Sequence, residues 1–479
     1  MKNEDLSDLR HGGILLSWDK KQKNVYLQAE DTHTLIIGAT RSGKTRTVVL
    51  PSIVTLALAG ENLICNDPKG ELYGYTYPLL QRLDYEVITI DFKNPERSDR
   101  YNFLQPVLDA AIEGNIPMAV SRARDISQML VPDEGRQTDP IWLDGERSIL
   151  TTAILAVALE CKDPRCQNMA NVRHWISELC TPIPGTEQIP LVDYLDKLPQ
   201  TSPLKLAMAI AAIAPHKMRG SFYTSALATL DLFQDPNIHA MSALTEFDHM
   251  ATGEKKRAIF LILPDERSAY YPLAALFTYE QYQMLVQYAD ERGGRLPRRC
   301  NFLLDEFGNF VRIPDFDKFV TVGGGRGIRF HLFLQSLSQL DHRYGKELAG
   351  TIRSNCETWI YIFTRDLDTM QIVCKTLGTY TIKAPSVSGS TGGNSTASYN
   401  LASRDLLTVD ELRKLTRPYQ LILSRHDPAV GYAPDISKTI FNRLLGMGSP
   451  DHNRNLLLYR LTARPVRLAN VFYWEVKAR

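Results

Sequence analysis

The segment Gly38–Thr45 reads GATRSGKT, and it constrains the fold more than any other part of the chain. It follows the apolar run TLII, precedes a stretch with helical spacing and fits the pattern G-x-x-x-x-G-K-[ST]. Its glycines let the backbone bend so that successive N–H groups can point at phosphate oxygens. The sequence therefore predicts a strand, a phosphate-binding loop and a helix in direct succession, and not a glycine-rich turn that matches by accident.

The pattern also assigns roles to individual residues of this loop. Lys44 is expected to reach the β- and γ-phosphates of a nucleotide, and the Thr45 hydroxyl is expected to bind Mg²⁺. The residues predicted to surround the phosphates are Gly38, Thr40, Arg41, Ser42, Gly43, Lys44, Thr45 and Arg46.

A second candidate segment, Phe302–Glu306 (FLLDE), is an apolar run that ends in two acids. On such a strand, Asp305 is expected to hold the Mg²⁺ through water, and Glu306 to orient or deprotonate the attacking water. Paired acids at a strand end can also serve only as helix N-caps. A glutamate directly after the metal-binding acid indicates a hydrolase, because small-molecule kinases need no activator of water.

Two further strand ends carry polar residues. The run FHLFLQS ends in Gln335, which is expected to touch the γ-phosphate and report its loss, although a strand-end glutamine can also be purely structural. The segment Asp67–Glu71 (DPKGE) is placed near the nucleotide by its position at a strand end, or it forms only a turn between strand and helix.

Short β-branched and leucine-rich runs alternate with helical stretches along most of the chain. Runs that are apolar on both sides of the pleat indicate an α/β fold with a mostly parallel sheet covered on both faces. A β-hairpin formed by Ile14–Trp18 and Val25–Gln28 is expected at the sheet edge. The predicted strands of the sheet are Thr34–Ile37, Asn62–Asn66, Glu86–Asp91, Ala258–Leu263, Asn301–Leu304, Phe330–Leu334, Trp359–Phe363 and Leu421–Leu423.

This alternation stops between Asp91 and Ala258, where helical spacing dominates. We therefore expect an all-α domain at 103–252, inserted into a discontinuous nucleotide-binding domain formed by 1–102 and 253–479. The long interval between Lys44 and Asp305 independently favours an insertion. The Ser-, Thr- and Gly-rich segment 384–400 is expected to be a mobile surface loop.

The composition excludes several classes of protein. The chain of 479 residues is 44% hydrophobic and 23% charged with a net charge of +1, which argues against a disordered or a strongly basic protein. A polyanion must therefore meet a local basic patch or a pore lining. No apolar run is long enough to span a bilayer, and the seven cysteines are expected to be reduced thiols in a cytosol.

Taken together, these segments resemble the coupling-protein ATPases of type IV secretion and bacterial conjugation, the TraG/TraD-like family. The similarity extends from residue 12 to about residue 445. The blocks that carry it are GATRSGKT, DPKGE, DFKNPERSDRYNFL, MLVPDEGRQTDPIWLDGERSIL, LLDEFGNFVRIPDF, GGGRGIRFHLFLQSLSQLDHRYG and LLTVDELRKL.

The resemblance implies a RecA-like P-loop NTPase with an inserted all-α domain, assembled into homo-hexameric rings at the cytoplasmic face of the cell membrane. Such rings use ATP and Mg²⁺ to pass single-stranded DNA, bound without sequence preference, from a relaxase or relaxosome to the secretion channel. The all-α domain is implied to recruit the relaxase. Carried over to this chain, Lys44 and Thr45 are the phosphate and Mg²⁺ residues, Asp305 and Glu306 are the two acids, and Gln335 is the sensor.

Two departures from the family pattern matter. Members often carry Arg-x-Arg-Gly before the sensor strand, and the first arginine is a candidate finger that reaches a neighbour's nucleotide. Here Gly324 stands at that position, so Arg326 is the expected finger, with Arg329 or no finger as alternatives. The family's N-terminal membrane helices are also missing, so either they have been removed or a separate partner anchors the chain.

Nucleic-acid contact has candidate residues in two places. They are Arg292, Arg295, Arg298 and Arg299 before the acidic strand, and Arg454, Arg460, Arg464, Arg467, Lys477 and Arg479 in the tail. For either cluster taken alone, solvated surface charge is the favoured explanation. Two other functions remain open at this stage: an FtsK/HerA-like DNA translocase, and a non-hydrolysing adaptor that only docks substrate proteins.

Overall fold

The computed structural model describes residues 11–19, 21, 24–132, 139–186, 188–264, 266–390, 393–467 and 470–476. Within this part, the chain forms two compact units. The first unit contains the chain up to Gly60 together with Leu303–Gly308 and Arg329–Gly446. The second unit contains Glu61–Phe302, Asn309–Ile328 and the chain from Met447 onward.

The first unit is built on a mixed sheet with a parallel centre. Its strands lie in the order β2 (Val25–Gln28), β1 (Ile14–Trp18), β13 (Ala429–Tyr432), β12 (Tyr419–Leu423), β9 (Thr358–Phe363), β3 (Thr34–Gly38) and β8 (Ile328–Leu334). Strand β3 pairs in parallel with both β8 and β9, and every residue of β3 and β8 is buried. The continuous apolar runs thus form central strands, as predicted, whereas β13 was not predicted.

Helices of the first unit follow directly from its parallel strands. Strand β3 leads into a π-helical turn, η1 (Thr45–Val49), and then α1 (Leu50–Leu58), which is buried along almost its whole length. Pro51 is tolerated because it lies at the start of α1. Strands β8 and β9 lead into α14 (Leu337–Asn355) and α15 (Leu367–Leu377), so each parallel strand ends at the N-terminal side of a helix.

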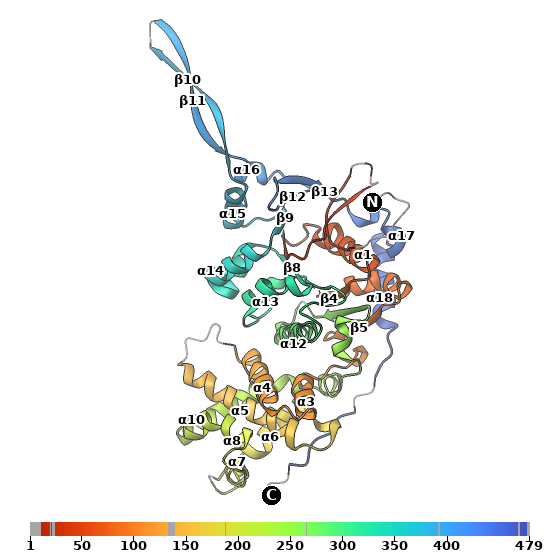
Figure 1. Ribbon diagram of the computed structural model, residues 1–479, viewed down its shortest axis with the longest axis vertical. Coiled ribbons are helices and arrows are strands. Elements are labelled where there is room, and N and C mark those ends of the chain that lie inside the picture. Colours follow the sequence, from red (N-terminus) through yellow and green to blue (C-terminus); the bar gives the residue numbers. More distant parts are fainter. Residues whose placement is uncertain are drawn as a thin grey trace. The chain divides into compact units, whose positions relative to one another are not determined.

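A long hairpin replaces the loop that was expected at 384–400. Strands β10 (Thr379–Ser390) and β11 (Gly393–Asp405) pair antiparallel, and the hairpin extends away from the sheet of the first unit (Figure 1). A ladder joins backbone groups, so a segment rich in Ser and Thr can form it without burying apolar side chains. The mobility of this segment stays a prediction, and residues 391–392 lie outside the described part.

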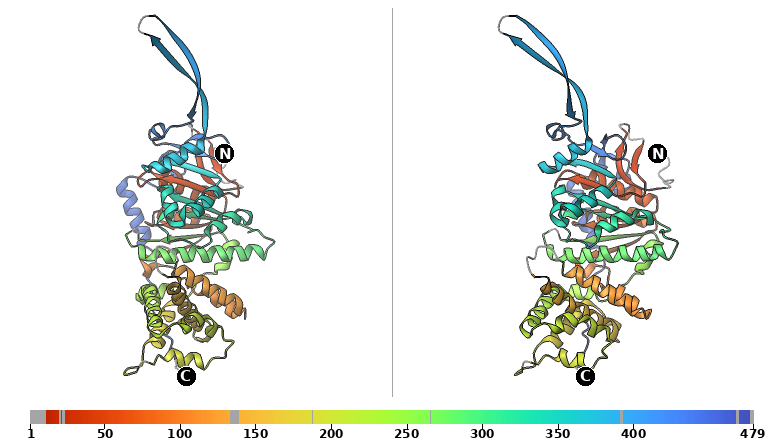
Figure 2. Two further views of the ribbon diagram at one scale, coloured as in Figure 1. Left: turned by 90° about the vertical axis from the view of Figure 1, so that its left-hand side faces the viewer. Right: turned by 60° about the vertical axis from the view of Figure 1, so that its left-hand side comes forward.

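The second unit has a parallel sheet in the order β4 (Asn62–Asp67), β6 (Arg257–Ile262) and β5 (Glu86–Asp91). All residues of β4 and β6 are buried, as expected for strands covered on both faces. Helices α2 (Glu71–Arg82), α12 (Tyr271–Asp290) and α18 (Pro450–Thr462) belong to this unit. The long green helix in Figure 2 is α12. Strand β7 (Cys300–Leu304) is divided, because its last two residues belong to the first unit.

The described residues between 103 and 252 form helices and connections but no strand, as predicted. They comprise α3 (Gln105–Ile112), α4 (Ile116–Leu130), α5 (Pro140–Glu160), α6 (Met169–Cys180), α7 (Pro190–Asp196), α8 (Pro203–Ala207), α9 (Ala209–Ile213), α10 (His216–Thr229) and α11 (Pro236–Met241). Helix α5 is capped by Asp139 and packs against α4, α6, α8 and α10. These helices share one compact unit with β4, β5 and β6, so the predicted domain boundaries stay a prediction.

None of the helices in the described ranges is long and apolar enough to cross a membrane.

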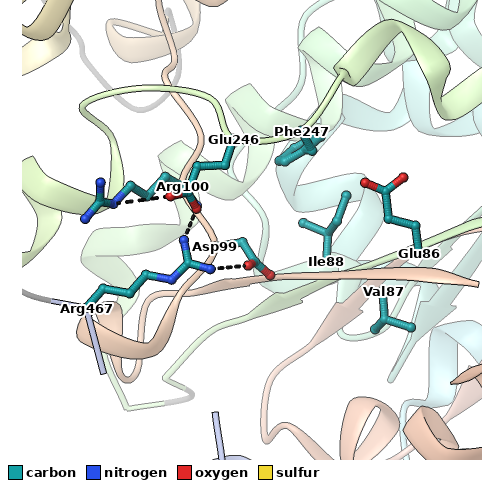
Figure 3. A pocket seen from close by; sticks show the side chains of 8 residues that line it. All are labelled: Glu86, Val87, Ile88, Asp99, Arg100, Glu246, Phe247 and Arg467. Carbon is teal, nitrogen blue, oxygen red and sulfur yellow. Dashed lines mark hydrogen bonds and ion pairs between the residues drawn. The ribbon is translucent and has the colours of Figure 1, made fainter. Parts of the chain in front are cut away.

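The C-terminal segment contacts both the β5 edge and the helical region of the second unit. After α18, the Arg464 guanidinium pairs with Asp91 at the end of β5, and Arg467 pairs with Asp99 and Glu246. Figure 3 shows the Arg467 pairs beside a cavity of about 560 Å³ that also borders β5. Farther on, Asn171 of α6 bonds the backbone of Phe472 and Trp474, so the segment connects the β5 edge to the helical region.

We predict that Arg464→Ala lowers the free energy of unfolding by about 3 kcal/mol. The Asp91 side chain is fully buried and that of Arg464 is 9% exposed, so the substitution leaves a buried charge without its partner. Urea unfolding at neutral pH measures the change. The control is Arg454→Ala, because Arg454 and its partner Asp451 are 78% and 87% exposed. Equal effects of the two substitutions would show that the tail does not stabilise the unit through this pair.

Candidate active site

The loop Gly38–Thr45 follows β3 as a tightly turned backbone. Its start is fixed by hydrogen bonds from Ala39 N to Phe363 O (2.7 Å) and from Ser42 N to Ala39 O (2.9 Å). Arg41 and Gly43 have φ angles of 65° and 90°, which lie in the left-handed region. A Cβ atom at Gly38 would lie 2.6 Å from the Ser42 hydroxyl. The close approach at Gly38 and the positive φ at Gly43 therefore favour glycine at these two positions.

Lys44 lies between the two acids that the sequence predicted. Its Nζ is 3.5 Å from Asp305 Oδ1 and 3.3 Å from Glu306 Oε1, and the lysine is only 6% exposed. Burial raises the pKa of Asp305, and the positive charge of Lys44 opposes that rise. The site thus concentrates one buried cation and two carboxylates at the end of β7.

Glu306 is held in an unusual backbone conformation at this position. Its φ is 54°, which is strained for a residue with a side chain. The Gln335 side-chain amide donates to Glu306 Oε2 at 2.9 Å, while Lys44 lies at Oε1. The structure therefore brings together Lys44, which was predicted from the phosphate-loop motif, and Asp305, Glu306 and Gln335, which were predicted from strand ends.

The residues present fit a magnesium nucleotide. The Ser42 Oγ is buried and has no hydrogen-bond partner among the described residues, as expected for a hydroxyl placed to meet a ligand. Phosphate oxygens attract a lysine ammonium and backbone N–H groups at a helix start. Thr45 and Asp305 supply the hard oxygen donors that Mg²⁺ prefers. Nucleotide contact by Thr40 stays a prediction.

Arg46, also predicted to lie near the phosphates, is engaged elsewhere. Its Nε and Nη2 donate to Asp435 at 2.6 and 2.8 Å, which is a bidentate pair within the first unit. This pair anchors the first turn after the loop to the segment that follows β13. A role of Arg46 in nucleotide contact stays a prediction.

The structure separates the arginines considered as a finger. Arg329 is fully buried and donates to Glu30 O at 3.2 Å, so it cannot reach a neighbouring subunit. Arg326 is 27% exposed and its Nε lies 3.1 Å from Asp290 Oδ1 within the second unit. Of these two arginines, only Arg326 remains a candidate for the finger, and its role stays a prediction.

Asp67–Glu71 forms the turn between β4 and α2. Gly70 has φ of 73° and donates to Asp67 O at 3.2 Å, and the Asp67 carboxylate accepts from Tyr73 N at 2.8 Å. These contacts support the interpretation of this segment as a turn between strand and helix.

Many of the arginines considered for DNA contact are bonded within the second unit. Arg299 pairs with Glu61, Arg298 donates to Glu254 O at 3.1 Å, and Arg292 stacks on Tyr288 at 3.6 Å. In the tail, Arg464 and Arg467 form the ion pairs described above. Lys477 and Arg479 lie outside the described residues. DNA contact by these clusters therefore stays a prediction.

One cation beside the loop was not predicted. Arg417 lies between α16 (Val409–Leu412) and β12, and its Nη2 donates to the carbonyl oxygen of Arg41. A Cβ atom added to Gly43 would lie 2.9, 3.0 and 3.1 Å from Nη1, Cζ and Nε of Arg417. The guanidinium therefore lies flat against Gly43. No motif marks this arginine, because its place depends on the packing of a segment far along the chain.

The sequence profile described as "Type IV secretory system Conjugative DNA transfer" matches residues 2–434. The chain belongs to this family. Proteins named VirD4 from Rhizobium rhizogenes and Agrobacterium fabrum are each 24% identical to it over 445 residues, or 88% of the chain. The chain spans 62% and 63% of the length of these two relatives.

Solved structures of coupling proteins share the fold. The unbound bacterial conjugative coupling protein TrwBdeltaN70 is 16% identical, with a TM-score of 0.65 over 92% of each chain. The plasmid coupling protein TrwB in complex with ADP and Mg²⁺ is 17% identical, with a TM-score of 0.62 over 85% of each chain. The predicted fold class, a RecA-like P-loop NTPase with a mostly parallel sheet and inserted helices, is confirmed.

We predict that Gly43→Ala destabilises the chain more than Gly446→Ala does. Both glycines have positive φ, so each substitution costs about 1 kcal/mol in backbone strain. Nothing lies within 4 Å of a Cβ at Gly446, whereas at Gly43 the new methyl group must displace Arg417. Urea unfolding compares the two variants, and equal losses of unfolding free energy would contradict the contact between Arg417 and the loop.

Proposed function

We propose that the chain is an ATP-driven coupling protein that delivers or translocates DNA to a type IV secretion channel. The observation that carries this proposal is the convergence of Lys44, Asp305, Glu306 and Gln335 beside the phosphate loop of a conjugative DNA transfer protein. A carboxylate held by two donors suits the activation of water, which a binding-only adaptor does not need.

Each residue of the site has a distinct task in ATP hydrolysis. The Lys44 ammonium has three N–H donors, so it can bind phosphate oxygens while remaining close to the acids. Thr45 and Asp305 would hold Mg²⁺, which supplies positive charge that stabilises the charge developing on the transferred phosphoryl group. Glu306 takes a proton from the attacking water, and the Gln335 amide fixes the orientation of the glutamate carboxylate.

The wider assembly is part of the same proposal. We infer a homo-hexamer at the inner face of the cell membrane, with 103–252 as a domain that recruits relaxase or relaxosome proteins. A membrane-anchoring partner or further membrane helices would hold it there. Family membership supports this arrangement, as do the VirD4 relatives and the structural similarity to the coupling protein TrwB. Single-stranded DNA would be bound without sequence preference, because phosphate contacts in a ring need few cations per subunit.

We predict that Glu306→Gln retains ATP binding but hydrolyses ATP at least 100-fold more slowly, because the amide cannot accept the proton of water. Lys44→Ala is expected to lose both ATP binding and hydrolysis, because the phosphates lose their cation. The measurements are the binding of a fluorescent ATP analogue and phosphate release with and without single-stranded DNA. Glu347→Gln, an exposed glutamate of α14, is the matched control. Full hydrolysis by Glu306→Gln would refute the assignment of the water-activating acid.

We predict that Arg326→Ala lowers ATP turnover about 1,000-fold and leaves nucleotide binding unchanged, because a finger acts on the site of a neighbouring subunit. Mixing Arg326→Ala with Lys44→Ala should then restore hydrolysis above the sum of the separate variants. In mixed rings, the Lys44→Ala subunits supply the finger to intact sites. Arg454→Ala controls for the loss of an exposed arginine. A mixture that gains no activity would exclude a finger role for Arg326.

A further inference from the structure

A second cation, Arg417, lies against the phosphate loop. The Arg417 guanidinium lies flat on Gly43 and donates to the Arg41 carbonyl, so it contacts the loop at two positions of the motif. We propose that Arg417 is a nucleotide-binding residue whose guanidinium donates to the phosphates of ADP or ATP seated on this loop. This inference rests on the proposed function, because it assigns a further binding residue to the same site.

The hydrogen-bonding capacity of Arg417 supports a ligand. A guanidinium has five N–H donors in a fixed fork. In the described part of the chain, Arg417 donates to one backbone carbonyl and forms no ion pair with a carboxylate. Its side chain is exposed, so the remaining donors are accessible from solvent. Nucleotide phosphates are the anions expected at this loop, and guanidinium–phosphate pairs are strong because they are charge-assisted.

Neighbouring arginines of the first unit show a different arrangement. Arg46 is neutralised by Asp435, and Arg404 is neutralised by Glu411. Arg413, only four positions before Arg417, has Asp410 at 3.8 Å. These neighbouring arginines are therefore paired with carboxylates of the protein. The charge of Arg417, which lies against the phosphate loop, remains available to a ligand.

The segment that carries Arg417 is well fixed. Helix α16 begins with a capping box, in which Thr408 and Glu411 exchange hydrogen bonds, and Leu412 is buried. After Arg417, the chain enters β12, whose residues from Gln420 onward are buried in the sheet. An arginine mounted between two anchored elements loses little conformational freedom when it binds, so it can add to affinity.

A purely structural role makes a different prediction. If Arg417 only supports the loop, its removal weakens nucleotide binding through a distorted backbone, and the dependence of affinity on salt is unchanged. If the guanidinium meets the phosphates, its removal also takes away one ionic contact. The affinity then falls less steeply as the salt concentration rises, because a screened attraction has been lost.

The test measures the Kd of the full chain for ADP with Mg²⁺ by calorimetry, at several salt concentrations. Arg417→Ala is expected to raise the Kd about tenfold and to flatten its salt dependence. Arg417→Lys should keep the salt dependence of the wild-type chain while losing part of the affinity, because lysine retains the charge but not the fork. Arg413→Ala is the matched control and is expected to bind ADP as the wild-type chain does.

Each result decides between the possibilities. An unchanged Kd in Arg417→Ala, or a raised Kd with the salt dependence of the wild-type chain, would overturn the proposed phosphate contact. Failure of the wild-type chain itself to bind ADP would instead refute the nucleotide function on which the inference rests. Thermal unfolding of each variant establishes that the loss of binding is not a loss of fold.

Discussion

The ammonium of Lys44, buried between the carboxylates of Asp305 and Glu306, is the interaction on which the site depends. Removing three charged groups from water is costly, and their mutual attraction offsets that cost only if the geometry is held closely. Strand β3 and the end of β7 provide this geometry, because parallel strands bring their carboxyl ends to one edge of a sheet. One ammonium group then faces two carboxylates, so the site carries an excess of negative charge. This excess suits it to bind the Mg²⁺ that accompanies a nucleotide.

The central strands of the sheet and the four central site residues could be predicted because their signals are local. Apolar runs marked β3, β7 and β8 to within two residues, and Asp305 and Gln335 each follow such a run. Arg417 could not be found in this way, since its contact with Gly43 joins segments far apart in sequence. The burial of Arg329 was equally invisible, because the arginine occupies a strand position that its charge alone would not predict.

The hairpin β10–β11 shows a different limit of sequence analysis. Low apolar content indicates that a segment cannot build a core, but it does not exclude a backbone ladder. At the base of the hairpin, Arg404 pairs with Glu411, and Glu411 also belongs to the capping box of α16. The chain then passes through Leu412 to Arg417 at the loop. A hairpin that extends from the sheet is therefore joined to the phosphate loop through one short, well-bonded segment.

The net charge of +1 does not show which arginines are available to bind phosphates; their contacts within the protein do. The tail arginines Arg464 and Arg467 are bound to acids of their own unit, so they stabilise the protein and are not free to meet phosphates. The same holds for Arg299, which pairs with Glu61. DNA contact by the rest of these two clusters stays a prediction. The net charge follows from 55 basic and 54 acidic residues, but the positive charge available to a polyanion depends on which cations the internal ion pairs leave free.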